Sequence, residues 1–200
     1  MPSGPSTLPV RVGPHAAPRP LHGLRAIAPG LFALALAWPL GGGAQAGPRW
    51  PPAASAACVP EAARHHGVDP WLLAAILQVE SGWRPHAVSR NANGTLDVGL
   101  AQINSIHFPE LARHGITPAD LFEPCVASHV AAWLLARQLR THGTTWRGLA
   151  SYHSTTPCHN QRYAAQVWNT LAGWGLVRGA TLAVASQQSC ATAPALENRR

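Results

Sequence analysis

Apolar residues recur at helical intervals through most of the chain between residues 58 and 174. The strongest pattern is WLLAAILQVESGW, residues 71–83, in which apolar side chains stand three and four residues apart, as on one face of a helix. Asp69 and Pro70 precede it as an N-cap and as the residue best tolerated at the first helical position. This stretch is therefore predicted to be a buried helix.

Further helices are predicted by the same spacing and by capping residues. They run over residues 60–66, from residue 117, over 124–142, within 144–153 with Thr144 or Thr145 as the cap, and over 163–174. The segment SRNANGTLDVGLAQIN, residues 89–104, breaks the pattern with Asn93 and Gly94, a strong tight-turn signal. The fold is therefore expected to be mainly α, with a short β-hairpin-like or irregular segment near 89–104.

The first 46 residues differ in composition from the rest of the chain. An apolar run, residues 26–40, follows Arg25 and precedes small residues that end in the sequence Ala-Gln-Ala, residues 44–46. This order is typical of a secretory signal that is cleaved after residue 46. A short membrane anchor is the alternative, but the run is brief for a bilayer span and contains Pro29 and Pro39. We therefore expect export to the periplasm and no stable membrane span after cleavage.

Four segments follow from these patterns: a leader over residues 1–46, a flexible lead-in over 47–57, a helical domain over 58–175 and a flexible tail over 176–200. All fifteen basic residues are arginine, and without the three in the leader twelve remain against eight acidic residues, a formal charge of +4. This modest positive charge favours an anionic partner such as a cell-wall polymer. Nucleic acid is not expected as a partner of an exported chain.

The cysteine and histidine patterns narrow the chemistry. The four cysteines all follow the leader, which suggests two disulfides in an oxidising compartment, although four cysteines permit three pairings. The eleven histidines are scattered and form no HExxH motif, so neither a metal site nor a cofactor is expected.

A carboxylate interrupts the apolar face of the helix predicted over residues 71–83. Glu80 stands four residues after Ile76 and three after Leu77, so it points where they point. A lone carboxylate is costly there and would keep its proton to a higher pH than a free glutamate. General acids need this shift, and buried carboxyls can reach a pKa of about 6 to 7. Alternatively, Glu80 bends out to solvent or pairs with Arg84.

Among the eight acidic residues, only Glu80 and Asp97 lack an obvious structural task. The other six fit caps, first helical turns or the tail: Glu61, Asp69, Glu110, Asp120, Glu123 and Glu197. Asp97 could be the second carboxylate of a glycosidase, but its turn-rich surroundings favour a role in organising the backbone. The chain would then offer one acid and no nucleophile, which is a problem for hydrolysis but not for every kind of glycan cleavage.

Four motifs occur in a recognisable order: ESGW at 80–83, VGLAQIN at 98–104, ASYH at 150–153 and RYA at 162–164. Together they resemble the transglycosylase SLT domain, the lysozyme-like fold of bacterial lytic transglycosylases, related in architecture to goose-type lysozyme. The spacing is most similar to small accessory enzymes of type III and type IV secretion systems and of conjugation machinery. The resemblance covers about residues 58–174.

The resemblance implies a reaction in which the substrate supplies the nucleophile. Glu80 would protonate the oxygen of the β-1,4 bond between N-acetylmuramic acid and N-acetylglucosamine. It would then take the proton of the muramyl C6 hydroxyl as that hydroxyl attacks C1, which closes a 1,6-anhydro ring without water. The implied enzyme is a peptidoglycan lytic transglycosylase, and we expect it to act as a monomer.

The resemblance also implies roles for other motif residues. Ser81 would cap the helix end or touch substrate, and Gln102 would line the sugar groove. Tyr152 would orient Glu80 or the substrate's acetamido group. Tyr163 matches the last motif, although its helical spacing suits simple core packing equally well. Trp83 is a further candidate groove residue.

Two positions depart from the family pattern, and the resemblance also bears on the cysteines. Ala101 stands where methionine is common, and His153 stands where asparagine is usual, so no role is carried over to His153. The pair Cys58–Cys125 resembles a disulfide of the secretion-associated subgroup, and Cys158–Cys190 follows by exclusion.

Two other functions compete with the transglycosylase. One is a hydrolytic muramidase of the lysozyme type that uses water held by Asp97 or Gln102. The other is a non-catalytic wall-binding factor that recruits secretion components.

Overall fold

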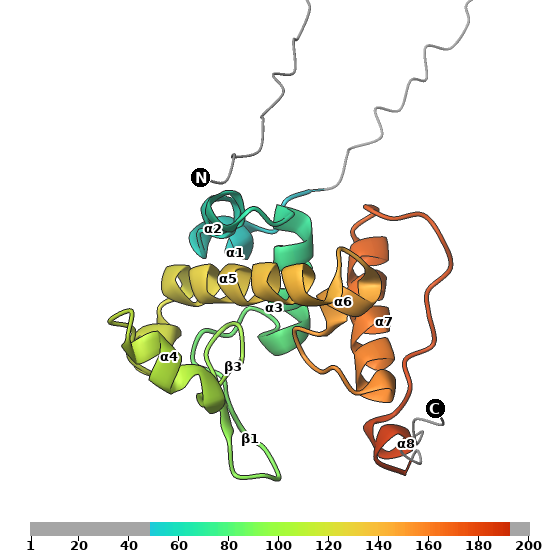
Figure 1. Ribbon diagram of the computed structural model, residues 1–200. Coiled ribbons are helices and arrows are strands. Elements are labelled where there is room, and N and C mark those ends of the chain that lie inside the picture. Colours follow the sequence, from blue (N-terminus) through green and yellow to red (C-terminus); the bar gives the residue numbers. More distant parts are fainter. Residues whose placement is uncertain (1–48, 193–200) are drawn as a thin grey trace, which may run out of the picture. The chain divides into compact units, whose positions relative to one another are not determined.

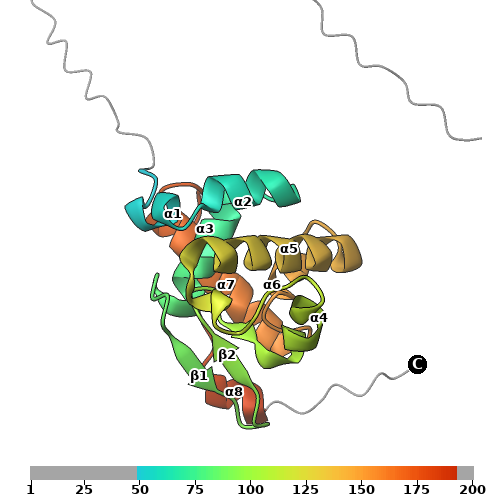
Figure 2. The same cartoon turned by 90° about the vertical axis from the view of Figure 1, so that its left-hand side faces the viewer.

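Helices make up most of the structure, a computed structural model that describes residues 49–192. Figures 1 and 2 show the helices packed around one another, with a small sheet at one side. The helices are α1 (Pro52–Ala56), α2 (Val59–His66), α3 (Pro70–Ser81), α4 (Phe108–Ala112), α5 (Pro124–His142), α6 (Trp146–Ala150), α7 (Pro157–Gly173) and α8 (Gln187–Thr192), with 3-10 turns η1 (Ser105–His107) and η2 (Asp120–Phe122). The mainly helical, lysozyme-like fold expected from the sequence is confirmed, whereas the predicted signal sequence lies outside the described residues.

Helix α3 begins at the predicted cap and ends two residues before the end of the predicted stretch, at Ser81. The Asp69 carboxylate accepts hydrogen bonds from the backbone N–H of Trp71 at 2.8 Å and of Leu72 at 3.0 Å, which satisfies two free donors of the first turn. Gly82 ends the helix in the left-handed conformation, with φ at 60°. The apolar face is fully buried and packs against α2, α5 and α7. This packing fixes the position of Glu80 in the last turn.

Helix α5 crosses α3 in Figure 1 and carries the apolar face predicted for it. Val130 and Leu134 are buried there together with Leu135. The helix contacts α2, α3, α6 and η2 and also touches the sheet through β3. It therefore connects the helical part of the core to the strands.

The predicted hairpin is present and gains a third strand. Strands β1 (Val88–Arg90), β2 (Leu96–Val98) and β3 (Ile103–Asn104) form one antiparallel sheet in the order β1-β2-β3. Asp97 on β2 faces Ser89 on one side and Asn104 on the other. Gly99 follows β2 with φ at 78°, and a Cβ atom there would collide with the carbonyl oxygen of Leu121. The close approach of η2 to the sheet therefore requires glycine at this position.

Both segments predicted to be flexible make contacts with the domain. In the lead-in, Ala54 on α1 is buried and Trp50 packs edge-on against Trp71, with ring centroids 4.5 Å apart. In the tail, the carbonyl of Leu182 accepts a hydrogen bond from the amide of Asn169 on α7 at 2.9 Å. The described parts of these segments are therefore held against the helices.

Within residues 49–192, no helix is long and apolar enough to cross a membrane.

Candidate active site

A cavity of about 240 Å³ opens between the end of α3, the sheet and the turn after α6. Helix α3 contributes Glu80 to its wall, the strands and their loops contribute Asp97 and Gln102, and the turn after α6 contributes Tyr152 and His153. Residues 73 positions apart, from 80 to 153, therefore meet around one opening. The helical packing and the sheet together build the site.

Glu80 lies in this wall with its carboxyl group largely shielded from water. Its Oε1 accepts a hydrogen bond of 2.6 Å from the Tyr163 hydroxyl. Burial raises the pKa of Glu80 to about 8, the Tyr163 hydrogen bond opposes the rise, and the negative charge of Asp97 adds to it. Glu80 is therefore protonated at neutral pH and can donate a proton to a group in the cavity.

The alternative pairing of Glu80 with Arg84 does not occur. The Arg84 side chain instead donates from Nε to the carbonyl oxygen of Ser81 at 2.7 Å, and its backbone N–H donates to the Ser81 hydroxyl at 3.1 Å. These bonds close the turn after α3 and turn the arginine away from the glutamate. Glu80 is thus left with a hydroxyl donor and no cation as its hydrogen-bond partner among residues 49–192.

Tyr163 combines the two roles that its sequence position left open. It lies on α7, is only 2% exposed and belongs to the core. Its hydroxyl nevertheless emerges at the end of α3 and reaches Glu80. Burial raises the pKa of Tyr163 well above its ordinary value, with the charge of Glu80 adding, so the phenol remains a proton donor. Tyr163 therefore holds the acid from behind the cavity wall and is not placed to bind substrate.

Tyr152 reaches the cavity that contains Glu80 from the turn after α6. Its hydroxyl donates to the carbonyl oxygen of Ala101 at 3.0 Å, and its ring lies 6.5 Å from that of Tyr163, with 19° between the ring planes. Burial raises its pKa well above the ordinary value. Tyr152 thus ties this turn to the loop between β2 and β3 and presents its ring to the cavity.

Gln102 lines the cavity and is fixed by its own side-chain amide. Its Nε2 donates to the carbonyl oxygens of Gly99 at 2.9 Å and Ala87 at 3.2 Å, and its Oε1 accepts from the Ser89 hydroxyl at 2.8 Å. Its backbone has φ at 48°, which is uncommon for a residue with a side chain. These bonds fix the Gln102 side chain in the cavity wall and join the loop before β3 to β1.

Ser81 takes the first of the two roles expected for it, since its hydroxyl caps the end of α3 by accepting from the backbone N–H of Arg84, and it does not line the cavity. Its hydroxyl donates to the carbonyl oxygen of Leu100 at 2.7 Å, and the residue is only 4% exposed. Of the two expected roles, the structure therefore supports capping and not a contact with substrate. Ser81 joins the end of α3 to the loop after β2, which sets the distance between the acid and the sheet.

Trp83 also lies elsewhere than the sequence interpretation placed it. Gly82 and Trp83 both have left-handed backbone angles, with φ at 60° and 66°, and this turns the chain away from the cavity directly after α3. The indole instead lines a separate apolar pocket of about 130 Å³ with Pro85 and Leu100. The structure therefore does not bring Trp83 together with Glu80.

Asp97 lies on the sheet side of the cavity in polar surroundings. Its Oδ1 accepts from the amide of Asn104 at 2.7 Å and its Oδ2 from the amide of Asn91 at 2.9 Å. Both amides also donate to the Thr95 hydroxyl, at 3.0 and 3.1 Å. Asp97 thus organises the loop between β1 and β2, as favoured from the sequence, and it also lines the cavity.

His107 is a cavity residue that the sequence did not indicate. Its Nδ1 lies 3.5 Å from Nη2 of Arg137, whose Nη1 forms an ion pair of 2.8 Å with Glu110. Burial lowers the pKa of His107, and the charge of Arg137 lowers it further. His107 lies in η1 and is contacted by Arg137 from α5, and no local sequence motif marks this position.

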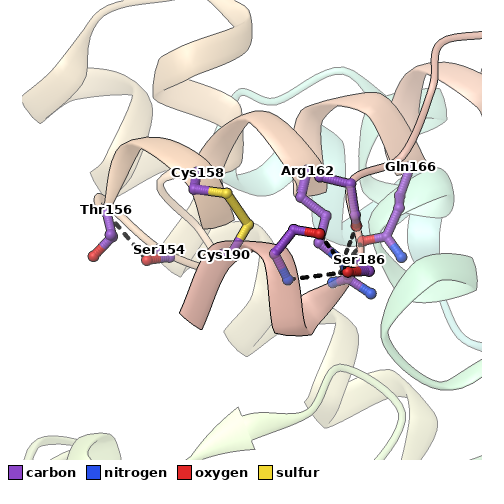
Figure 3. Close-up of a disulfide and its surroundings, with 9 residues drawn as sticks. Ser154, Thr156, Cys158, Arg162, Gln166, Ser186 and Cys190 are labelled. Atoms are coloured by element: carbon purple, nitrogen blue, oxygen red, sulfur yellow. Dashed lines mark hydrogen bonds between the residues drawn. A yellow bond between two sulfur atoms is a disulfide. The ribbon is translucent and has the colours of Figure 1, made fainter. Parts of the chain in front are cut away.

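Two disulfides brace the domain, one with the partners implied by the family resemblance and the other with the partners left by exclusion. Cys58–Cys125 joins the start of α2 to the start of α5, and Cys158–Cys190 joins the start of α7 to α8. Figure 3 shows the second bond beside Arg162, whose Nε donates to the carbonyl oxygen of Ala185 at 3.0 Å. The tail is therefore attached to α7 close to the turn that carries Tyr152.

Among residues 49–192, no three histidine, cysteine or acidic side chains are grouped so that they could hold a metal ion. The polar groups that line the cavity are two carboxyl groups, side-chain amides, the hydroxyl groups of Ser89 and Tyr152, and two histidines.

Comparison with known proteins places this geometry in a family. The profile of the transglycosylase SLT domain matches residues 57–170. Invasion protein IagB of Salmonella typhimurium is 34% identical over 116 residues, which cover 56% of this chain and 72% of IagB. X polypeptide of Escherichia coli is 36% identical over 123 residues, 58% of this chain and 73% of the relative. Protein IpgF of Shigella flexneri is 34% identical over 100 residues, 50% of this chain and 66% of IpgF. The chain belongs to the transglycosylase SLT domain family and is an enzyme of the lytic transglycosylase class.

Proposed function

We propose that this enzyme cleaves the β-1,4 bond between N-acetylmuramic acid and N-acetylglucosamine in peptidoglycan and leaves 1,6-anhydromuramyl ends. The observation that carries the proposal is the position of Glu80, a buried carboxyl in the cavity wall bonded to the Tyr163 hydroxyl, where burial raises its pKa to about 8. The cavity beside it offers amides and aromatic rings, which suit a polar sugar chain.

In the proposed reaction, Glu80 acts twice. Its proton passes to the glycosidic oxygen as the bond from muramyl C1 to that oxygen breaks, so N-acetylglucosamine leaves with a free hydroxyl group. The resulting carboxylate then accepts the proton of the muramyl C6 hydroxyl while O6 bonds to C1. Glu80 ends protonated, as it began, and no water enters the product.

Surrounding residues would support both steps. The Tyr163 hydroxyl donates to Oε1, so it can stabilise the carboxylate that exists between the two proton transfers. Asp97 places negative charge near the cavity, where positive charge develops on the sugar ring in the transition state. Gln102 and Tyr152, both held by hydrogen bonds to backbone carbonyls, would form the rigid walls of the sugar groove.

We also propose that the enzyme acts in the periplasm and opens the cell wall locally for a secretion or conjugation machine. The motif spacing supports this, as does the relative whose name describes it as an invasion protein. Two disulfides suit an oxidising compartment. Fractionation of the source cells tests the location, because release of the protein by osmotic shock is expected and its retention with cytosolic markers would contradict it.

Digestion of purified sacculi with mass analysis of the fragments tests the reaction. Transglycosylase products carry anhydromuramyl ends and are one water lighter than products of a muramidase. We expect anhydro ends from the wild type, a severe loss of them from Glu80→Gln and normal products from Glu61→Gln, which changes an exposed carboxylate on α2. Reducing muramyl ends would instead establish hydrolysis, with Asp97 as the residue to examine next. Absence of any cleavage by the folded wild type would favour a wall-binding role.

A further inference from the structure

His153 occupies the cavity wall beside Tyr152, and the mechanism above makes no use of it. Its ring stacks on that of Tyr163, with centroids 4.9 Å apart and only 5° between the planes. Neither ring nitrogen has a hydrogen-bond partner among residues 49–192. The imidazole is thus held by its face while its polar edge remains available to a ligand.

The groups around His153 determine its charge. Burial lowers its pKa, His159 and Arg162 on α7 lower it further, and Asp97 on β2 opposes them. Glu80 on α3 shares the same cavity and is itself neutral at neutral pH. The two stacked tyrosines keep their protons. The imidazole is therefore neutral at pH 7, with one N–H donor and one acceptor nitrogen.

Resting on the proposed function, we propose that His153 is a substrate-contact residue whose neutral ring accepts a hydrogen bond from an acetamido N–H or a hydroxyl group of the glycan. Protonation removes the acceptor, because both ring nitrogens of the cation are donors. Asparagine, which the family usually has here, offers an acceptor that does not titrate. The histidine therefore makes substrate recognition by this chain dependent on pH.

This contact predicts two separate limbs in the pH profile of kcat/KM. On the alkaline side, activity falls as Glu80 loses its proton near pH 8. On the acid side, it falls as His153 gains a proton and loses its contact with the sugar. Each limb can therefore be assigned by changing one residue.

The test compares three variants on soluble uncrosslinked peptidoglycan strands. His153→Asn is expected to lose the acid limb while it keeps the alkaline limb and most of kcat/KM at the optimum. His153→Phe keeps an aromatic ring for stacking but has no acceptor, so kcat/KM at the optimum should fall about two- to tenfold, as expected for a neutral hydrogen bond. His142→Asn, at the exposed end of α5, should match the wild type.

An NMR titration provides a readout that needs no turnover. In Glu80→Gln, labelled with isotopic histidine, a soluble N-acetylglucosamine oligomer should shift the ring signals of His153, identified by their absence in His153→Asn. The contact would be overturned, and the proposed function left intact, by the following result: the wild type is active, His153→Asn keeps the acid limb, and His153→Phe keeps full kcat/KM. If the wild type forms no anhydro ends, the function fails, and the titration alone decides whether His153 meets glycan. A ring signal that does not move then overturns the contact as well.

Discussion

Two carboxyl groups face the same cavity from opposite sides and differ in what surrounds them. Glu80 ends an apolar helical face and has a tyrosine hydroxyl as its donor. Asp97 lies on a strand, and an asparagine amide donates to each of its oxygens. A carboxylate accepts hydrogen bonds, so the two amide donors satisfy an anion at Asp97. At Glu80, burial favours the protonated form more than the Tyr163 hydrogen bond opposes it. The helical side of the site thus provides the acid, and the sheet side provides a carboxylate held in place by hydrogen bonds.

The largest test of this comparison is the loss of activity on removing each carboxyl. Glu80→Gln keeps the shape and an acceptor for Tyr163 but has no proton to give. Its kcat on sacculi is expected to fall about 10²- to 10⁴-fold, the usual contribution of a general acid. Asp97→Asn should fall much less. An equal loss in both variants would remove the distinction and favour a pair of carboxylates as in hydrolases.

A second test follows from the stability of the folded chain. The pKa of Glu80 rises from its ordinary value of 4.5 to about 8 on folding. Between these pH values the folded state retains a proton that the unfolded state has lost, so the free energy of unfolding falls as pH rises. The slope approaches about 1.4 kcal/mol per pH unit within that window, which amounts to a few kcal/mol in all.

Glu80→Gln should remove this slope. Denaturant unfolding of both proteins should be measured from about pH 4 to about pH 9. The free energy of unfolding of the variant, relative to that of the wild type, should rise up to about pH 8 and stay constant above it. Glu61→Gln should follow the wild type throughout. Parallel curves for Glu80→Gln and the wild type would mean that the carboxyl is not desolvated.

The same contrast shows how far the sequence alone could be interpreted. Helical spacing predicted α3 and placed Glu80 on its apolar face, and the Asn93-Gly94 turn predicted the hairpin. These features depend on neighbours within a few residues. The bond between Tyr163 and Glu80 joins residues 83 positions apart, so it depends on how α7 packs against α3.

The placements and contacts that the sequence did not indicate have the same origin. Trp83 follows Glu80 closely in the sequence, but Gly82 and Trp83 adopt left-handed backbone conformations that change the direction of the chain. The spacing of apolar residues does not predict this turn. His107 becomes a wall residue because Arg137 reaches it from α5, thirty positions away. The Ala- and Ser-rich tail lacks an apolar pattern, yet its backbone carbonyls accept bonds from side chains on α7. Polar contacts between distant segments leave no periodic signal.

Removing the Tyr163 hydroxyl tests the surroundings of Glu80, the carboxyl on the helical side of the cavity. The Tyr163 hydrogen bond lowers the pKa of Glu80 against the effect of burial, so Tyr163→Phe should raise that pKa. The alkaline limb of kcat/KM is expected to move upward by about half to one pH unit, the equivalent of one hydrogen bond. Tyr152→Phe is the matched control, because its hydroxyl binds the Ala101 carbonyl instead. A limb that stays in place in Tyr163→Phe would show that the hydroxyl does not contact the titrating group.

The smallest expected effect comes from the sheet side and has the opposite sign. The charge of Asp97 is the last of the three influences on Glu80 and raises its pKa, so Asp97→Asn should lower it. We expect the alkaline limb to move downward by roughly a few tenths of a pH unit, since solvent near the cavity screens the charge. Asn91→Ala is the control, because it loosens the same loop and keeps the charge. A downward shift in both variants would assign the effect to the loop, whereas a shift in Asp97→Asn alone, reduced by added salt, would assign it to the carboxylate.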